Sequence, residues 1–291
     1  MSQMSPAFLA EQANQEAPVR PDAKQVKLSR LLLVPHLAAL EADLWRLRAE
    51  YDEQFAASDH PRKAEYPVGF CLEISKGVYA LLQREIAAPR SAGMMALREF
   101  CRQGGLAKRI WGNLRDRYFQ NAFQIGNLYV DVANDTVDPA KPKVEILPLA
   151  KSGFNMLDDF GTYARIAEKY WKGTAYPNRY LPDLAPMFPV LLVRPQGRIE
   201  LHAQYQTILY RNMYHDFADA ERFLLNDEIR HRALPDEMIR VLSDKAGLIC
   251  EPFEDDQIKN LFRAARTSQL RLDSQRCQVM LDRVIAISRT A

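Results

Sequence analysis

Carboxylate and aromatic side chains occur close together between residues 115 and 148 of this chain. Asp131, Asp135 and Asp138 follow a short apolar run, and carboxylates this close together supply the oxygen ligands that Mg²⁺ or Mn²⁺ prefers. A cation held there could neutralise charge on a diphosphate leaving group. The pattern predicts a catalytic or metal site in which Asp131 and Asp135 bind a divalent cation or orient a polar substrate. The same aspartates also suit the polar turn that ends an ordinary strand.

Basic and aromatic residues around these carboxylates could complete a binding site. Arg115 or Arg117 would contact a phosphate or carboxylate group of the substrate. Tyr118 or Tyr129 would stack on a sugar ring or a base. The stretch therefore indicates an enzyme that acts on a small polar or phosphorylated molecule.

Part of this stretch is similar to a sequence block of a known enzyme family. The block R-(x)-G-G-x-Y-x-D-x-D of glycosyltransferases with a sugar-binding DxD motif resembles Arg117-Tyr118 followed by Gly126-Asn127-Leu128-Tyr129-Val130-Asp131. Asn127 replaces the second glycine of the block, and Ala133 replaces its second aspartate. The resemblance implies a transferase that uses a nucleotide-sugar.

Histidines form a second candidate site, for a metal such as iron or zinc. Glu228 and His231 are three positions apart in a region that favours helix, and this spacing places both side chains on one helix face. His202 or His215 could complete a mononuclear metal site. Surface histidines, or histidines hydrogen-bonded in the core, would give the same pattern.

A non-catalytic interaction protein is the alternative to an enzyme. Residues 176–188 are rich in aromatic residues and proline, and the chain ends in a long helical pattern. Both features suit a groove on a protein partner or on a second copy of this chain.

Composition narrows the environment and the partners of the protein. The net charge of +2 gives no general attraction to nucleic acid or to an anionic membrane. No apolar run approaches the length of a membrane span. The four cysteines, Cys71, Cys101, Cys250 and Cys277, lie far apart without a C-x-x-C pair, so we expect reduced thiols and a cytoplasmic protein.

The elements that must position these residues follow from the spacing of apolar residues. Periods of three to four residues predict the helices, and short runs rich in β-branched residues predict the strands. Helices are predicted at residues 27–55, 71–87, 91–102, 106–123, 161–171, 217–232, 235–246 and 254–287. Strands are predicted near residues 128–132, 143–147, 189–194 and 198–204, the last two as a hairpin.

This order of elements indicates an α+β fold. Helices come first, then strands, then helices again, so the fold should be mainly helical with a small, mostly antiparallel sheet. Residues 1–26 hold few large apolar side chains and are expected to be a disordered lead. Residues 27–291 are expected to form a single globular domain.

Overall fold

The computed structural model describes residues 4–201 and 206–289, and it has the predicted α+β fold. Its contacts divide the chain into two compact units, where the sequence predicts one domain. The amino-terminal unit is Glu16–Met156. The carboxy-terminal unit is Leu157–Ala291 together with Met1–Gln15.

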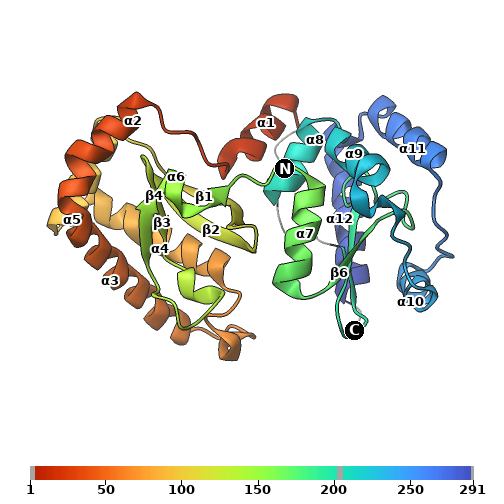
Figure 1. The fold of residues 1–291 in the computed structure, drawn as a ribbon, viewed down its shortest axis with the longest axis horizontal. Coiled ribbons are helices and arrows are strands. Elements are labelled where there is room, and N and C mark those ends of the chain that lie inside the picture. Colours follow the sequence, from red (N-terminus) through yellow and green to blue (C-terminus); the bar gives the residue numbers. More distant parts are fainter. Residues whose placement is uncertain (1–3, 202–205, 290–291) are drawn as a thin grey trace. The chain divides into compact units, whose positions relative to one another are not determined.

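An antiparallel sheet forms the centre of the amino-terminal unit (Figure 1). Its strand order is β4-β3-β2-β1-β5, so β1 to β4 are neighbours in chain order and β5 pairs with β1. The predicted strands near residues 128 and 143 are confirmed as β3 and β4. The strands are β1 (Ala107–Leu114), β2 (Tyr118–Ile125), β3 (Leu128–Asp131), β4 (Glu145–Pro148) and β5 (Phe154–Asn155).

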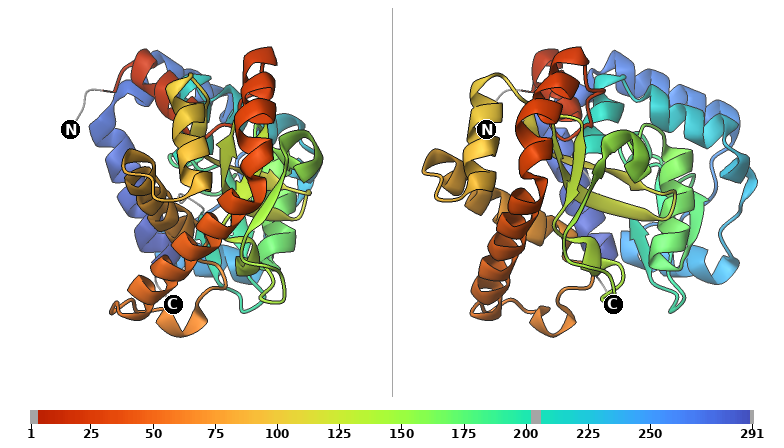
Figure 2. Two further views of the ribbon diagram at one scale, coloured as in Figure 1. Left: turned by 90° about the vertical axis from the view of Figure 1, so that its left-hand side faces the viewer. Right: turned by 60° about the vertical axis from the view of Figure 1, so that its left-hand side comes forward.

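Helices cover one face of this sheet and make the largest core of the unit (Figure 2). Phe123 and Val130 are directly paired across β2 and β3, so their side chains share the face that the helices bury. Leu44, Val78 and Leu97 pack against that face from three different helices. The helices of this unit are α2 (Ala23–Leu28), α3 (Leu37–Ala56), α4 (Cys71–Ala87), α5 (Ala92–Arg102) and the short α6 (Leu149–Ser152).

The helix predicted at residues 106–123 is wrong, because this segment forms the hairpin of β1 and β2. Ile110 and Leu114 fit a helical period, but in the strand they lie on one face of the sheet. Trp111 and Phe119, on the other face, are buried as well. Because both faces are buried, the segment lacks the polar–apolar alternation that marks a strand.

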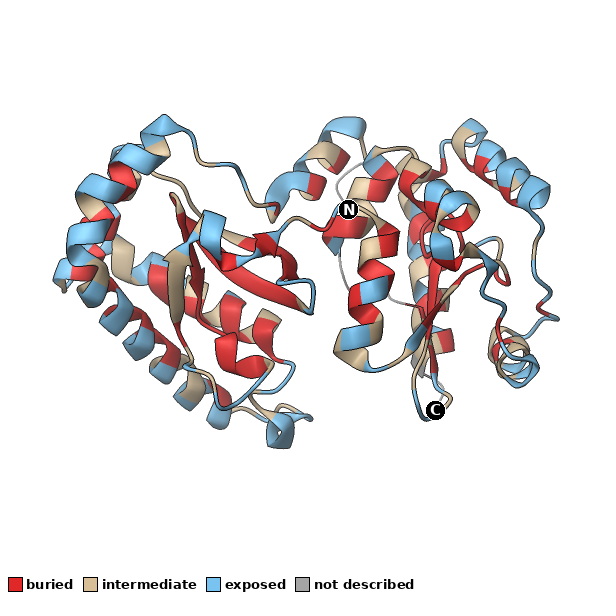
Figure 3. Ribbon diagram, in the orientation of Figure 1, coloured by how far each residue is buried: buried red, intermediate tan, exposed pale blue. Residues whose placement is uncertain are grey.

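A three-stranded antiparallel sheet of order β6-β7-β8 forms the centre of the carboxy-terminal unit. Helix α7 packs on β6 and β7, and α12 packs on β8. Figure 3 shows that the strands of this sheet are mostly buried. The strands are β6 (Thr174–Pro177), β7 (Val190–Val193) and β8 (Ile199–Leu201). The helices are α1 (Pro6–Gln15), α7 (Phe160–Trp171), α8 (Gln206–Tyr214), α9 (Ala218–Asn226), α10 (Asp236–Ala246), α11 (Asp255–Thr267) and α12 (Ser274–Arg289).

Most predicted elements of this unit are confirmed, with breaks that the sequence pattern did not show. The hairpin at residues 189–204 is confirmed as β7 and β8, although residues 202–204 lie outside the described part. The single helix predicted at residues 254–287 is α11 and α12, separated at Gln269, whose φ of 51° is left-handed. The helix predicted at residues 217–232 ends at Asn226, and a 3-10 turn follows over Glu228–His231.

Residues 1–26, where composition predicts disorder, hold α1 and part of α2. Leu9 and Ala13, four positions apart on α1, are buried, and α1 packs on α8. Two apolar residues on one helix face are enough to dock a short helix, although the segment as a whole is polar. Within the described residues, no helix is both long and apolar enough to span a membrane.

Candidate active site

An open polar cleft lies in the carboxy-terminal unit, where the start of α7, the end of α8 and the start of α9 meet. Its volume is about 570 Å³, and it opens to solvent. The residues that line this α8–α9 cleft are Asp158, Asp159, Arg211, His215, Ala218, Asp219 and Arg222. Six of these seven side chains are polar or charged, so the cleft suits a polar ligand.

His215 and Asp219 form a hydrogen-bonded pair in this cleft. His215 Nδ1 lies 2.7 Å from Asp219 Oδ2, and Asp219 is buried while His215 is partly exposed. An ionised carboxylate can only accept a hydrogen bond, so Nδ1 carries the proton of the neutral imidazole. Nε2 is then the nitrogen with a lone pair, which is the arrangement that a general base requires.

A strained turn between α8 and α9 brings the two residues together. Asp216 and Phe217 both have positive φ, at 54° and 64°, which non-glycine residues rarely adopt. The fully buried Asn212 holds the turn: its Oδ1 accepts from Ala220 N at 3.1 Å, and its Nδ2 donates to Pro186 O at 2.7 Å. The conformation persists because such contacts over-determine it.

Two arginines, one on α11 and one in the 3-10 turn Leu270–Leu272 that follows it, also fix this turn. Arg266 Nε donates to Asp216 O at 3.0 Å, and its guanidinium also pairs with Glu221. Arg271 Nε lies 3.2 Å from Asp216 Oδ1. Residues distant in the sequence thus keep the His215–Asp219 geometry in place.

The cleft is lined by both acidic and basic side chains. Arg222, whose side chain is 61% exposed, lies 3.5 Å from Asp219 Oδ1. Arg211 lies one helical turn before His215, so both face the same side of α8. Asp159 caps α7 by accepting from Thr162 N at 2.7 Å. The arginines can bind an anionic group beside the imidazole, as guanidinium groups do for phosphates and carboxylates.

The structure places Asp131 inside the amino-terminal unit, without access to solvent. Asp131 Oδ2 accepts from Gln120 Nε2 at 2.7 Å and from Tyr129 OH at 2.9 Å. Its Oδ1 accepts from Ala133 N at 2.8 Å. Burial raises the pKa of Asp131 to about 6. Asp131 and Tyr129 therefore lie together as predicted residues of one site, but their side chains hydrogen-bond to each other.

Asp135 and Asp138 have partners of their own. Asp135 is buried and accepts from Arg48 Nη1 at 2.8 Å and from Nη2 at 3.0 Å. Arg48, which is fully buried, also donates to Val132 O and to Asp52. Asp138 is exposed and accepts from Ala140 N within its own turn. The structure gives the three aspartates separate partners, although they lie at and just after the end of the same strand.

The residues predicted to bind substrate beside Asp131 are spread along the hairpin. Arg115 donates to Glu145 Oε2 at 2.7 Å and to Ser152 O at 3.1 Å. Arg117 is exposed, and the Nζ atom of Lys141 lies 5.1 Å from the ring centre of Tyr118. Tyr118 and the buried Tyr129 lie on β2 and β3.

The predicted histidine site is divided in the structure. Glu228 and His231 are both exposed on the 3-10 turn, and His231 Nε2 accepts from Arg230 Nε at 2.8 Å. His215 lies in the α8–α9 cleft, and His202 lies outside the described residues. Across residues 4–201 and 206–289, no group of three or more His, Cys, Asp or Glu residues is arranged to hold a metal ion.

The segments predicted to face a partner are largely packed inside their own unit. Within residues 176–188, Tyr180, Leu181 and Phe188 are buried. On α12, Val284 and Ile287 are buried. The exposed Asp183 forms an ion pair with Arg283, which links the two segments.

Sequence reasoning named His215 but missed Asp219, Arg211 and Arg222. The signal was present, since Arg211, His215 and Asp219 recur at intervals of four. A predicted helix start at residue 217 hid this spacing, because it separated Arg211 and His215 from Asp219.

Fold and cleft define a two-unit α+β protein with a histidine–aspartate pair in a polar cleft. No protein-family model, no curated protein and no solved structure matches this chain.

Proposed function

We propose that the protein is an enzyme that performs acid–base chemistry on a small anionic substrate in the α8–α9 cleft. The observation that carries this proposal is the 2.7 Å contact of His215 Nδ1 with buried Asp219, in an open cleft that two arginines also line. Histidine is the side chain that transfers protons most often in enzymes, and a carboxylate partner can hold its ring in the required orientation.

Each residue has a distinct role in this proposal. His215 Nε2 takes a proton from the attacking group or gives one to the leaving group, and Asp219 holds the ring and stabilises its charged form. Arg211 and Arg222 bind the phosphate or carboxylate of the substrate. Because residues 117–131 resemble a glycosyltransferase block, a nucleotide-sugar is the first substrate to be tested.

Ligand binding tests the arginine part of the proposal. Inorganic phosphate, pyrophosphate and UDP-glucose are titrated into the protein by calorimetry. We expect at least one of them to bind the original chain, and to bind Arg222→Ala more weakly. Arg230→Ala, which removes an arginine outside the cleft, should bind like the original chain. Equal binding by both variants would place the anion elsewhere.

Turnover tests the role of His215. Conversion of UDP-glucose is followed by phosphorus NMR in the original chain, in His215→Gln and in His231→Gln, whose histidine is exposed outside the cleft. Loss of a general acid–base lowers turnover by about 10²–10⁴-fold, so His215→Gln should show that loss and His231→Gln should not. Equal turnover in the two variants would refute the role of His215.

A further inference from the structure

A second pocket, of different chemistry, lies in the carboxy-terminal unit between α1, α8 and α12. Its volume is about 300 Å³, the lower end of the range for small-molecule sites. The residues that line this methionine pocket are Met4, Phe8, Met187, Gln206, Leu209, Tyr210, Met213, Ser274, Cys277, Gln278 and Leu281.

The lining of the methionine pocket is uncharged and more apolar than polar. Among the lining residues that the structure describes there is no Asp, Glu, Lys, Arg or His. Met4, Met187 and Met213 are unbranched and polarisable, so they can adapt to irregular ligands and contact aromatic rings favourably. The polar groups of the lining are the amides of the exposed Gln206 and Gln278 and the hydroxyls of Ser274 and Tyr210. The Nε2 atom of Gln278 donates to Asp282 Oδ1 at 2.8 Å.

Helix α8 separates this pocket from the α8–α9 cleft. Gln206, Leu209, Tyr210 and Met213 line the pocket at helical spacing, while Arg211 lies on the opposite side of the helix and lines the cleft. The pocket is therefore a separate site, and its ligand would not meet the charges of the cleft.

Helix α1 supplies one wall of the pocket. The rings of Phe8 and Tyr210 meet edge to face, with centroids 5.8 Å apart. Leu9, the next residue on α1, is fully buried, so the helix is anchored beside the pocket. An edge-to-face pair of this kind stabilises the wall beyond what its buried area contributes.

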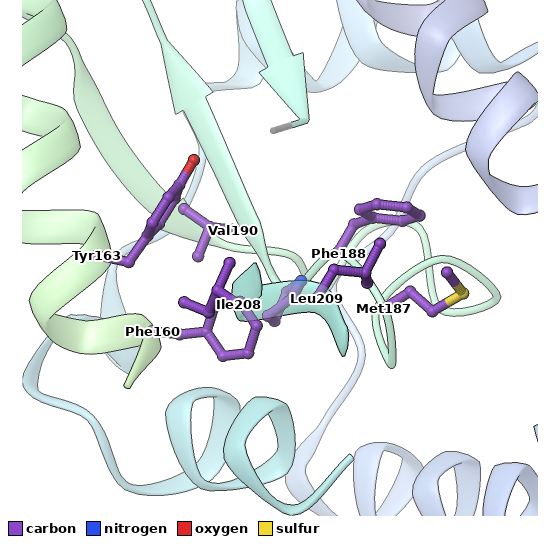
Figure 4. A pocket seen from close by; sticks show the side chains of 8 residues that line it. Phe160, Tyr163, Met187, Phe188, Val190, Ile208 and Leu209 are labelled. Carbon is purple, nitrogen blue, oxygen red and sulfur yellow. The ribbon is translucent and has the colours of Figure 1, made fainter. Parts of the chain in front are cut away.

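Met187 and Leu209 line the methionine pocket, and they also line a small apolar cavity beside it (Figure 4). Figure 4 shows Phe160 and Tyr163 on one side of this cavity and Met187 on the other. The cavity has about 10 Å³ of space, barely enough for one water molecule, and an apolar void of this kind stays dry. Since methionine has three rotatable bonds, a turn of Met187 could add this space to the pocket.

We infer that the methionine pocket binds an uncharged, mainly apolar small molecule, such as an aromatic ring system or a short acyl chain. The volume admits a molecule of this size, and the flexible methionines fit it closely. The lack of a charged lining residue selects against anions, which would lose their hydration without gaining a partner.

The uncharged dye N-phenyl-1-naphthylamine, which fluoresces in apolar surroundings, tests this inference. We expect saturable binding of one dye per chain. Leu281→Trp fills the pocket and should abolish the saturable signal, whereas Val279→Trp adds the same ring at an exposed position of the same helix and should retain it. Absence of saturable binding, or equal binding by both variants, would overturn the inference.

Cysteine alkylation tests dye binding in the original chain, so its result does not depend on whether Leu281→Trp folds. Cys277 lines the pocket, and Cys250 is a buried cysteine of the same unit outside it. Dye at saturation should slow the reaction of Cys277 with iodoacetamide and leave Cys250 unchanged, as measured by mass spectrometry of the peptides. Equal rates for Cys277 with and without dye would refute binding in this pocket.

Discussion

Asp131 illustrates what burial does to a single carboxylate. Its pKa of about 6 compares with an ordinary value of 3.8, so the folded chain keeps its proton to a higher pH than the unfolded chain. The contribution of this raised pKa to the free energy of unfolding is fully present below about pH 4. It is lost as the pH rises through about 6 and Asp131 loses its proton. At about 1.4 kcal/mol for each pKa unit, the loss is on the order of 3 kcal/mol.

We predict that Asp131→Asn removes this pH dependence. The unfolding free energy of the original chain, measured by urea titration, should fall relative to that of Asp131→Asn between pH 4 and pH 7. Asp138→Asn removes an exposed carboxylate of the same region and should keep the pH dependence of the original chain. A constant difference between the original chain and Asp131→Asn would contradict the prediction.

Arg48 and Asp135 form a buried ion pair with two hydrogen bonds. Removal of one partner leaves an uncompensated buried charge, so we predict that Arg48→Met destabilises the amino-terminal unit by about 3–5 kcal/mol. The double variant Arg48→Met, Asp135→Asn should regain part of this loss, because no buried charge remains. Urea unfolding measures both effects, and a double variant no more stable than the single one would argue against the pair.

At the scale of elements, the turn from α8 to α9 decides whether the candidate site exists. We predict that Asn212→Ala destabilises the carboxy-terminal unit by about 1–3 kcal/mol for each partner left unpaired, which are Ala220 N and Pro186 O. The loosened turn should also separate His215 from Asp219. Thermal unfolding checks the first effect, and loss of the NMR signal of the His215 Nδ1 proton checks the second.

Asn226→Ala is the matched control for Asn212→Ala, because Asn226 is exposed at the end of α9. It should change neither the unfolding temperature nor the His215 proton signal appreciably. A signal that persists in Asn212→Ala would mean that Arg266 and Arg271 alone suffice to hold the turn.

Helix α4 could be predicted from the sequence, whereas the hairpin of β1 and β2 could not. Helix α4 has the predicted bounds of residues 71–87, since its apolar positions recur at helical spacing and Pro89 follows it. Strands β1 and β2 were missed because Trp111 and Ile110, neighbours that point to opposite faces, are both buried. The sequence gives apolar spacing along one element, but it does not show what covers the second face.

The candidate site was only partly predictable for a related reason. His215 stood out by residue type, but its partner Asp219 lies across a helix break that two left-handed non-glycine residues create. The left-handed conformation of these two residues cannot be predicted from the residues around them. The contacts that enforce it come from Arg266 and Arg271, far along the chain. Local sequence patterns identify a site residue more readily than the geometry that activates it.

The two units differ in how they are built from the chain. Glu16–Met156 is one continuous segment with its own core, as an independently folding domain requires. The carboxy-terminal unit is discontinuous, because α1 reaches it from the start of the chain. A fragment of residues 157–291 alone would therefore lack the helix that covers α8.

We predict that the fragment 157–291 binds a peptide of residues 1–15 and is stabilised by it. The peptide buries Leu9 completely, and loss of a buried leucine to alanine costs about 2–5 kcal/mol, so a Leu9→Ala peptide should bind at least tenfold more weakly. A Glu11→Ala peptide, changed at an exposed position, should bind like the original peptide. Calorimetry measures these affinities, and the same fragment should gain binding of N-phenyl-1-naphthylamine when the peptide restores Met4 and Phe8 to the pocket wall. A fragment that is stable alone and indifferent to the peptide would show that α1 is not an integral part of the carboxy-terminal unit.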